Sequence, residues 1–208
     1  MCFLSGDEVA EFSPRVLDAL RTPMETGEVS IARLASHVRY PARFQLVLAA
    51  NPCPCGRYGI AGASCSCAPM SVRRYQQRLS GPVLDRVDIH HLMAPSLLGQ
   101  SEATAGDPSA VVAERVQQAR ERQQHRLSEL PWQLNAQVPG AQLRKLPAPE
   151  GMQLVDDAVR RGQLSARGVD KTVRLAWTLA DLGGNDTIRR SDLLMALNFR
   201  SQVWGSAA

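Results

Sequence analysis

Apolar positions fall into patterns that predict strands in the first part of the chain. Residues 44–50 form a continuous apolar run, FQLVLAA, which is typical of a strand covered on both faces of a parallel sheet. The shorter run CFL at residues 2–4 predicts a second strand, ending before Asp7 and Glu8. Residues 28–43 hold two runs rich in β-branched and aromatic side chains on either side of a short break. This arrangement predicts a β-hairpin.

The remaining periodic segments predict helices. Residues 13–27 carry helix signals, with Ser13 as N-cap, Pro14 in the first turn and Gly27 past the end. Beyond residue 110 the pattern is entirely helical, with predicted helices over residues 110–130, 150–162 and 164–182, and a last one that Asp186 or Thr187 caps and that runs to Phe199. Residues 96–110, SLLGQSEATAGDPSA, are small and polar and predict a linker. We therefore expect an α/β region over residues 1–95, a linker, and a helical domain over residues 111–208.

Composition and charge narrow the class of protein. The 208 residues are 44% hydrophobic and 21% charged, which is ordinary for a globular protein. Aromatic residues make up only 5%, which disfavours a surface that stacks many bases. The net charge of +4 permits an anionic partner without requiring one. No apolar run approaches the roughly 20 residues that span a bilayer, and no basic-then-apolar leader follows Met1. We expect a cytoplasmic protein with no membrane partner.

Four of the five cysteines form a cluster with the spacing C-x-C-x9-C-x-C: Cys53, Cys55, Cys65 and Cys67. In a reducing compartment such a cluster indicates metal ligands rather than disulfides. Four thiolates satisfy tetrahedral Zn²⁺ and leave no open position, so the pattern favours structural over catalytic zinc. The alternative is four partly buried thiols in a turn. His37, His90 and His91 lack a comparable partner spacing, and we expect structural or solvated roles for them.

Four strings identify a resemblance that covers nearly the whole chain: DEVAEFSPRVLDALRTPMETGEVSIAR, PARFQLVLAANPCPCG, VRRYQQRLSGPVLDRVDIH and LSARGVDKTVRLAWTLADL. The chain resembles the magnesium-chelatase-like AAA+ ATPases, and most of all their ComM/YifB branch. The resemblance implies an α/β fold: a partial P-loop NTPase core from the Walker B strand onward, followed by an all-helical lid. Related rings, hexameric in this family, bind ATP and Mg²⁺ between subunits. ComM-type members are implicated in DNA branch migration during recombination and natural transformation.

The resemblance also implies catalytic roles for five residues. Asp7 and Glu8 match the Walker B pair, with Asp7 near Mg²⁺ and Glu8 on the attacking water. Asn51 matches sensor 1, which contacts the water or the γ-phosphate. Arg86 matches the arginine finger that reaches a neighbouring subunit, and Arg167 matches sensor 2.

Each assignment has a plainer alternative. The acidic pair could begin a surface loop, and Asn51 could cap the turn before Pro52. Arg86 could form an ion pair with Asp85 or Asp88. Arg174 lies two helical turns after Arg167 and is the other candidate for sensor 2, and either arginine could be solvated.

Basic residues suggest DNA contacts. In this family the hairpin over residues 28–43 points toward the central pore, and it carries Arg33, His37 and Arg39 near its tip. Arg73 and Arg74 begin a second basic stretch. Binding to a DNA backbone without sequence preference needs little more than such charges, although a charged hairpin or helix face is usually only solvated.

The phosphate-binding part of the family is missing from the sequence. No G-x-x-x-x-G-K-[ST] motif occurs, so no Walker A loop holds the β- and γ-phosphates. Ser5-Gly6 interrupts the apolar strand before Asp7, which we expect to weaken that strand. We expect an incomplete module that binds ATP only with a Walker A-bearing N-terminal half or homologous subunits as partners. The alternative is a non-enzymatic, zinc-stabilised DNA- or protein-binding remnant. A porphyrin metal chelatase is disfavoured, because the four-cysteine loop points to the ComM/YifB branch.

Overall fold

The fold was analysed in a computed structural model that describes residues 2–33, 36–60, 62–93, 106–146 and 149–201. The chain divides into two compact units, the first ending at Val87 and the second beginning at Asp88. The expected linker over residues 96–110 lies mostly outside the described residues, which resume at Gly106.

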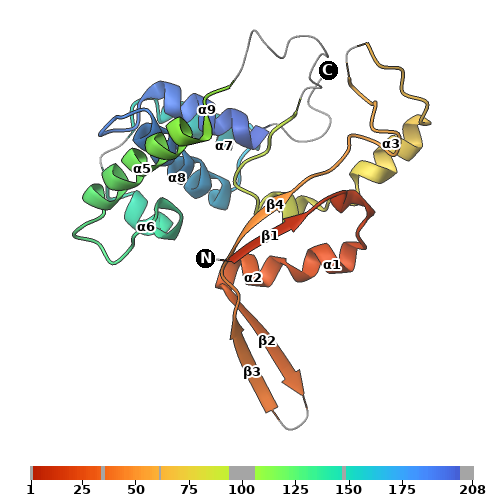
Figure 1. Cartoon of the computed structure of the whole chain (residues 1–208), viewed down its shortest axis with the longest axis horizontal. Coiled ribbons are helices and arrows are strands. Elements are labelled where there is room, and N and C mark those ends of the chain that lie inside the picture. The colour runs from red at the N-terminus through yellow and green to blue at the C-terminus, as the bar shows by residue number, and fades with distance from the viewer. Residues whose placement is uncertain (1, 34–35, 61, 94–105, 147–148, 202–208) are drawn as a thin grey trace. The chain divides into compact units, whose positions relative to one another are not determined.

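The first unit combines strands and short helices (Figure 1). Its elements, in chain order, are β1 (Cys2–Gly6), η1 (Val9–Glu11), α1 (Pro14–Ala19), α2 (Arg21–Thr26), β2 (Glu28–Arg33), β3 (Ser36–Pro41), β4 (Phe44–Leu48), α3 (Pro69–Gln76) and α4 (Gly81–Leu84). The helical signals of residues 13–27 are confirmed as two consecutive helices, and Gly27 ends the second with a left-handed φ of 70°. Ser13 precedes α1, but its side chain makes no capping hydrogen bond.

Strands β1 and β4 pair in parallel, from Cys2 opposite Phe44 to Gly6 opposite Leu48. The ladder includes Ser5 and Gly6, so these residues do not interrupt the strand before Asp7. Gly6 is needed for close packing, because a Cβ atom there would lie 2.8 Å from Cγ1 of Val9 and 3.3 Å from Cδ2 of Leu48. The absence of a Cβ atom at Gly6 therefore lets Val9 and Leu48 pack closely against the end of β1.

Residues 44–48 are not covered on both faces within the described part of the chain. Side chains of β4 alternate between half-buried and exposed, and Phe3 and Val47 are 63% and 46% exposed. The core of this unit is small and is built from Val9, Leu17, Leu79 and Val83. In the described residues β1 and β4 form a sheet of only two strands, and a parallel pair needs further elements to cover both its faces.

The predicted hairpin over residues 28–43 is confirmed. Strands β2 and β3 pair antiparallel, from Glu28 opposite Pro41 to Arg33 opposite Ser36. Every described side chain of the two strands is exposed. At the base, the backbone N–H of Ala42 donates to the carbonyl of Gly27 at 2.7 Å. The tip, residues 34–35, lies outside the described residues.

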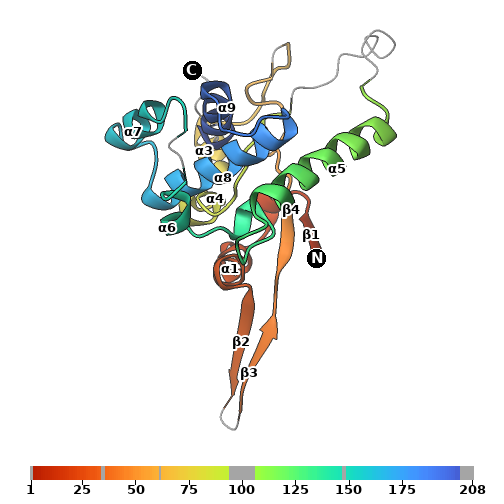
Figure 2. The same ribbon diagram turned by 90° about the vertical axis from the view of Figure 1, so that its left-hand side faces the viewer.

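The second unit is helical throughout its described residues. Its elements are α5 (Ser109–Arg126), η2 (Asn135–Gln137), α6 (Gly140–Leu143), α7 (Gln153–Arg160), α8 (Ala166–Leu182) and α9 (Arg190–Ser201). Helix α8 contacts α5 and α9 (Figure 2). Its fully buried Ala176 lies in a core that also holds the fully buried Val155 and Leu193. None of the described helices combines the length and apolarity that a bilayer crossing needs.

The predicted helices are confirmed except at their ends. The last helix begins at Arg190 rather than just after Asp186 or Thr187. Asp192 supplies the local cap, because its Oδ2 accepts a hydrogen bond from the backbone N–H of Arg189 at 2.9 Å. A carboxylate within the first turn can satisfy an N–H group that has no partner inside the helix.

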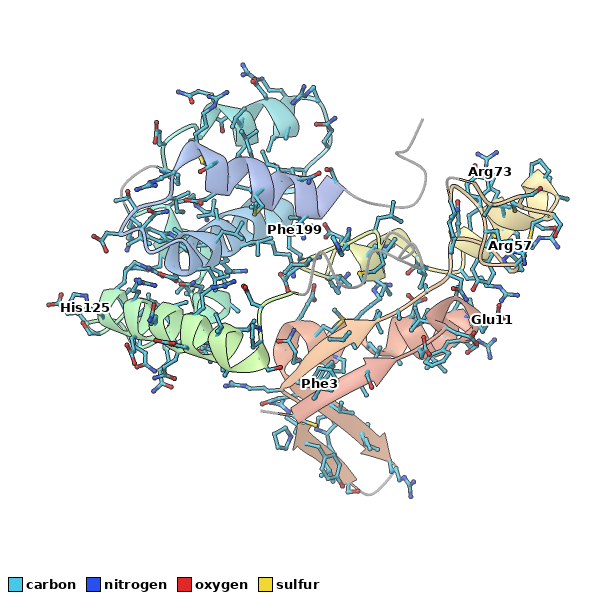
Figure 3. All side chains as sticks on the ribbon, turned by 45° about the horizontal axis from the view of Figure 1, so that its top comes forward. Phe3, Glu11, Arg57, Arg73, His125 and Phe199 are labelled. Atoms are coloured by element: carbon cyan, nitrogen blue, oxygen red, sulfur yellow. The ribbon has the colours of Figure 1, made fainter. Side chains whose placement is uncertain are left out.

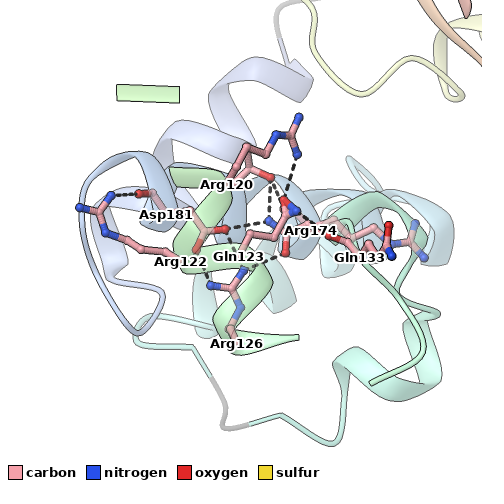
Figure 4. Close-up of polar contacts among 9 residues, drawn as sticks. Arg120, Arg122, Gln123, Arg126, Gln133, Arg174 and Asp181 are labelled. Carbon is pink, nitrogen blue, oxygen red and sulfur yellow. Dashed lines mark hydrogen bonds and ion pairs between the residues drawn. The ribbon is translucent and has the colours of Figure 1, made fainter. Parts of the chain in front are cut away.

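A buried polar network joins α5 and α8 (Figure 4). Asp181 is almost fully buried and receives two hydrogen bonds from the guanidinium of Arg126 and one from Nδ2 of Asn135 at 3.0 Å. The Arg126 guanidinium also lies 4.1 Å from the ring centre of Trp177. Gln123 on α5 donates to the carbonyl of Gln133 at 3.0 Å. The network fixes how the two helices pack, because each buried charge has a partner.

Candidate functional site

The parallel pairing of β1 and β4 brings the acidic pair and Asn51 to one edge of the sheet. Asp7 and Glu8 directly follow β1, and Asn51 lies three residues after β4. Two backbone hydrogen bonds continue the pairing beyond the ladder. The N–H of Ala49 donates to the carbonyl of Gly6 at 2.8 Å, and the N–H of Val9 donates to the carbonyl of Ala49 at 3.0 Å. All three candidate side chains are exposed. The carboxyl ends of parallel strands are where α/β sheets bind ligands.

Glu8 has a conformation that the sequence did not indicate. Its φ of 48° and ψ of 41° are left-handed, and it is the one non-glycine residue with a positive φ in the described part of the chain. The Oδ1 atom of Asp7 accepts a hydrogen bond from the Glu8 backbone N–H at 2.9 Å. Such a conformation costs about 1–2 kcal/mol and is concentrated at functional sites. The strain coincides with the residue that resembles the water-activating acid.

Helix α3 and Arg78, two residues after its end, connect the loops that follow the two strands. Nε2 of Gln76 donates to the carbonyl of Pro52, next to Asn51, at 3.0 Å. Nη1 of Arg78 donates to the carbonyl of Ala10 at 3.0 Å and to a carboxylate oxygen of Glu11 at 2.8 Å. Sequence reasoning missed both contacts. They link partners separated by 24 and 68 residues, and no local pattern predicts them.

The four clustered cysteines meet in the loop between Asn51 and α3. Their sulfur atoms all lie within 4.8 Å of one another. The Sγ atom of Cys53 is 3.4 Å from that of Cys55 and 3.8 Å from that of Cys65, and Cys55 and Cys65 are 3.6 Å apart. A tetrahedral site with Zn–S bonds of about 2.3 Å has sulfur atoms about 3.8 Å apart. The cluster therefore has the size of a zinc–tetrathiolate site.

Neighbouring groups shift the pKa values of two thiols in this cluster, Cys55 and Cys67, in opposite directions. The backbone of Arg57 and the thiol of Cys53 lower the pKa of Cys55 to about 6. For Cys67, a contact with the backbone of Cys55 lowers the pKa, but the Cys55 thiol and burial outweigh it and raise the pKa to about 12. Thiolates this close repel one another, so a cation is needed for all four to ionise together.

Arg86 lies just after α4 and is held by the first unit. Its Nη2 atom is 2.8 Å from Oε1 of Glu25 on α2, and Nη1 donates to the carbonyl of Pro82 at 2.6 Å. The side chain is only 11% exposed. Of the two carboxylates suggested as partners from the sequence, Asp88 binds Lys171 at 2.6 Å. The ion pair between Arg86 and Glu25 joins residues that are 61 positions apart in the sequence, so no local sequence pattern could predict it.

The two sensor 2 candidates differ in environment. Arg167 is exposed in the first turn of α8. Arg174 is half-buried, and its Nε atom donates to the carbonyl of Val138 at 2.9 Å. That bond gives Arg174 a structural role inside the helical unit. Of the pair, Arg167 is the one with an exposed side chain.

The hairpin register separates the basic residues near its tip. His37 and Arg39 lie on one face, because alternate residues of a strand share a face. Arg33 lies on the opposite face, which it shares with the exposed apolar residues Val29, Ile31, Val38 and Tyr40. The three residues expected to contact DNA together therefore do not form one surface.

Comparison with known proteins identifies two matching family models. One, described as magnesium chelatase, subunit ChlI, matches residues 1–100. The other, described as magnesium chelatase, subunit ChlI C-terminal, matches residues 106–200.

Three longer proteins illustrate the range of similarity. An uncharacterized protein of Mycobacterium tuberculosis is 45% identical over 196 residues, covering 93% of this chain and 39% of the relative. The uncharacterized protein YifB of Escherichia coli is 39% identical over 201 residues, covering 94% of this chain and 38% of YifB. The competence protein ComM of Haemophilus influenzae is 38% identical over 199 residues, covering 95% and 38%. The chain thus spans about two-fifths of the length of the relatives it matches.

Proposed function

The chain belongs to the magnesium chelatase family, and we propose that it supplies the catalytic acids, sensors and arginine finger of an AAA+ ATPase that acts on DNA. The observation that carries this proposal is the position of Asp7, Glu8 and Asn51, which follow the carboxyl ends of two paired parallel strands. Similarity to a competence protein supports DNA as the substrate on which the ATPase acts.

The three residues at this edge have complementary roles in phosphoryl transfer. Asp7 would hold Mg²⁺, which neutralises charge on the phosphate oxygens when bound. Glu8 orients the attacking water and accepts its proton, and its left-handed backbone directs the side chain differently from a regular strand end. Asn51 offers a neutral amide from the adjacent strand. An amide can contact the water or the γ-phosphate without adding charge.

Arg86 and Arg167 act at the margins of the nucleotide site. As a finger, Arg86 stabilises the charge that develops on the γ-phosphate bound by a neighbouring subunit. In the isolated chain Glu25 neutralises it, so assembly must loosen that ion pair. Arg167, in the exposed first turn of α8, acts as sensor 2.

We propose that another segment contributes the phosphate loop, either a Walker A-bearing N-terminal half or a homologous subunit in a hexameric ring. Two observations support such a partner. The sequence lacks the motif, and the β1–β4 sheet has exposed apolar side chains, including Phe3 and Val47. Strands added beside β1 and β4 would extend the sheet, and the helices that connect such strands would cover these residues.

We assign a structural zinc ion to the four-cysteine cluster. The sulfur spacing fits a tetrahedral site, and four thiolates leave no position for substrate. The ion would hold the loop that joins Asn51 to α3. Because Arg78, two residues after the end of α3, contacts the segment after Glu8, the zinc site would support the geometry of the catalytic edge.

ATP hydrolysis by a chimera tests this function. The full chain replaces the segment that it matches in Escherichia coli YifB, so that the rest of YifB is expected to provide the phosphate loop. We expect Mg²⁺-dependent ATP hydrolysis by the chimera, stimulated by branched DNA, and none by the chain alone. Intact YifB is the reference. Hydrolysis by the chain alone would contradict the need for an external phosphate loop, and an inactive chimera beside active YifB would contradict the catalytic roles.

The second candidate is a zinc-stabilised DNA- or protein-binding module without enzymatic activity. The small core of the first unit and its two-stranded sheet favour it. Binding to DNA that is the same with and without nucleotide, in both the chain and the chimera, would support this candidate.

A further inference from the structure

Positive charge is concentrated in one part of the sequence. Residues 29–84 contain seven arginines and no aspartate, glutamate or lysine. The other residues hold 17 of the 24 basic residues and all 20 acidic ones, so this segment alone has a formal charge of +7 in a chain of +4. Such an asymmetry indicates a surface for a polyanion.

Three of these arginines project from the four-cysteine loop and the helix that follows it. Arg57 lies in the loop, and Arg73 and Arg74 lie on α3. All three are exposed, and none has an ion-pair partner within the described ranges of the chain. Figure 3 shows Arg57 and Arg73 extending from these two elements. We call the three residues the loop–helix arginine surface.

A shallow depression of about 160 Å³ lies at this surface. Its lining joins Pro54 of the loop to Ser71, Arg74, Tyr75 and Arg78 of α3 and the residues after it. The Arg78 guanidinium lies 5.8 Å from the centre of the Tyr75 ring and is also bound to Glu11. Arg74 and the Ser71 hydroxyl provide donors at the wall, whereas the charge of Arg78 is already balanced. An arginine fork beside a hydroxyl is suited to a phosphate group.

The four cysteines fix the shape of this surface. Pro54 lies between Cys53 and Cys55, and Arg57 lies two positions after Cys55. The backbone N–H of Tyr58 approaches the sulfur of Cys53 at 3.4 Å. Pro54 lines the depression together with residues of α3, and metal binding by the cysteines would hold Pro54 and Arg57 in place before a ligand arrives.

We propose that the loop–helix arginine surface binds the phosphate backbone of DNA. The choice of DNA as the polyanion rests on the proposed function, whereas the surface itself follows from the charges and the depression. Guanidinium contacts to phosphates carry no sequence preference, so the site holds a DNA strand without reading bases. It is separate from the hairpin, whose basic residues lie on two opposite faces.

Fluorescence anisotropy with a labelled 20-base-pair DNA duplex of mixed sequence tests the proposal. The assay uses the full zinc-loaded chain in the absence of ATP. The test variant carries Arg57→Ala, Arg73→Ala and Arg74→Ala. We expect its affinity to fall roughly tenfold, and the slope of log affinity against log salt to become shallower by about 2 to 3 units, because each lost phosphate contact contributes about 0.9. Zinc content equal to that of the wild type shows that the loop remains folded.

Two further variants complete the test. Arg15→Ala with Arg161→Ala and Arg189→Ala removes three other exposed arginines and the same net charge, and it should leave the salt slope unchanged. Replacing Arg57, Arg73 and Arg74 by lysine should retain most of the affinity. Equal losses in both alanine variants, no loss in either, no DNA binding by the wild type, or tighter binding to polyglutamate than to DNA would each overturn the proposal. Because this assay uses no nucleotide, its failure is distinguishable from failure of the ATPase assignment.

Discussion

Replacing Cys53 by alanine should abolish stoichiometric zinc binding and unfold the loop between Asn51 and α3. Cys53 is completely buried at the centre of the cluster, and removing one of four ligands destroys a closed tetrahedral site. Structural zinc provides about 10–16 kcal/mol of apparent binding free energy in zinc-finger peptides. The first unit has only a small hydrophobic core to compensate for that loss. We therefore expect the loop to become sensitive to proteases.

Metal analysis of the purified full chain measures this effect. The wild type should contain about one zinc ion per chain, and the Cys53→Ala variant should contain almost none. Cys2→Ala is the matched control, because Cys2 is exposed in β1 and lies outside the cluster. Zinc-free wild type after expression with added zinc, or full zinc retention by Cys53→Ala, would be inconsistent with the assigned metal site.

The Asp181→Ala variant should lose about 3–5 kcal/mol of folding free energy in the helical unit. The Asp181 side chain is only 3% exposed and accepts hydrogen bonds from Arg126 and Asn135. Without it, the guanidinium of Arg126, itself 17% exposed, remains as an uncompensated buried charge. The contact of Arg126 with the Trp177 ring offsets only a small part of this cost.

Urea unfolding followed by tryptophan fluorescence measures the change, since Trp132 and Trp177 both pack in the core of the helical unit. Asp157→Ala is the control. It also removes a carboxylate that pairs with an arginine, but both side chains are largely exposed, so its effect should stay below about 1 kcal/mol. Equal destabilisation by the two variants would show that the buried network does not stabilise the unit.

Local patterns predicted most elements of the fold. The apolar run at residues 44–50 and the β-rich segments of residues 28–43 gave the correct strands, because side-chain alternation and β propensity act over a few residues. The apolar run misled on burial. A continuous apolar run indicates that a strand is stable only when other elements pack on both of its faces. In the described part of the chain no other element covers the face that holds Val47 and Phe3, so both side chains are exposed.

The sequence predicted which residues form the candidate site. It did not predict the long-range contacts that hold these residues in place. The sequence placed Asp7, Glu8 and Asn51 near strand ends, and the parallel pairing then brought those ends together. The contacts of α3 with both loops, and the ion pair between Arg86 and Glu25, depend on long-range packing. The left-handed backbone at Glu8 was equally hidden, because glutamate has no intrinsic preference for it.

The most direct test of the account is ATP hydrolysis by the YifB chimera carrying Glu8→Gln. This change keeps the size of the side chain and removes the carboxylate that would accept a proton from the attacking water. We predict that hydrolysis falls at least about 100-fold while ATP binding is retained. The matched variant Glu28→Gln, at an exposed position at the start of β2, should hydrolyse ATP like the unmodified chimera. Equal hydrolysis by the Glu8→Gln and Glu28→Gln chimeras would contradict the claim that this chain supplies the catalytic acid.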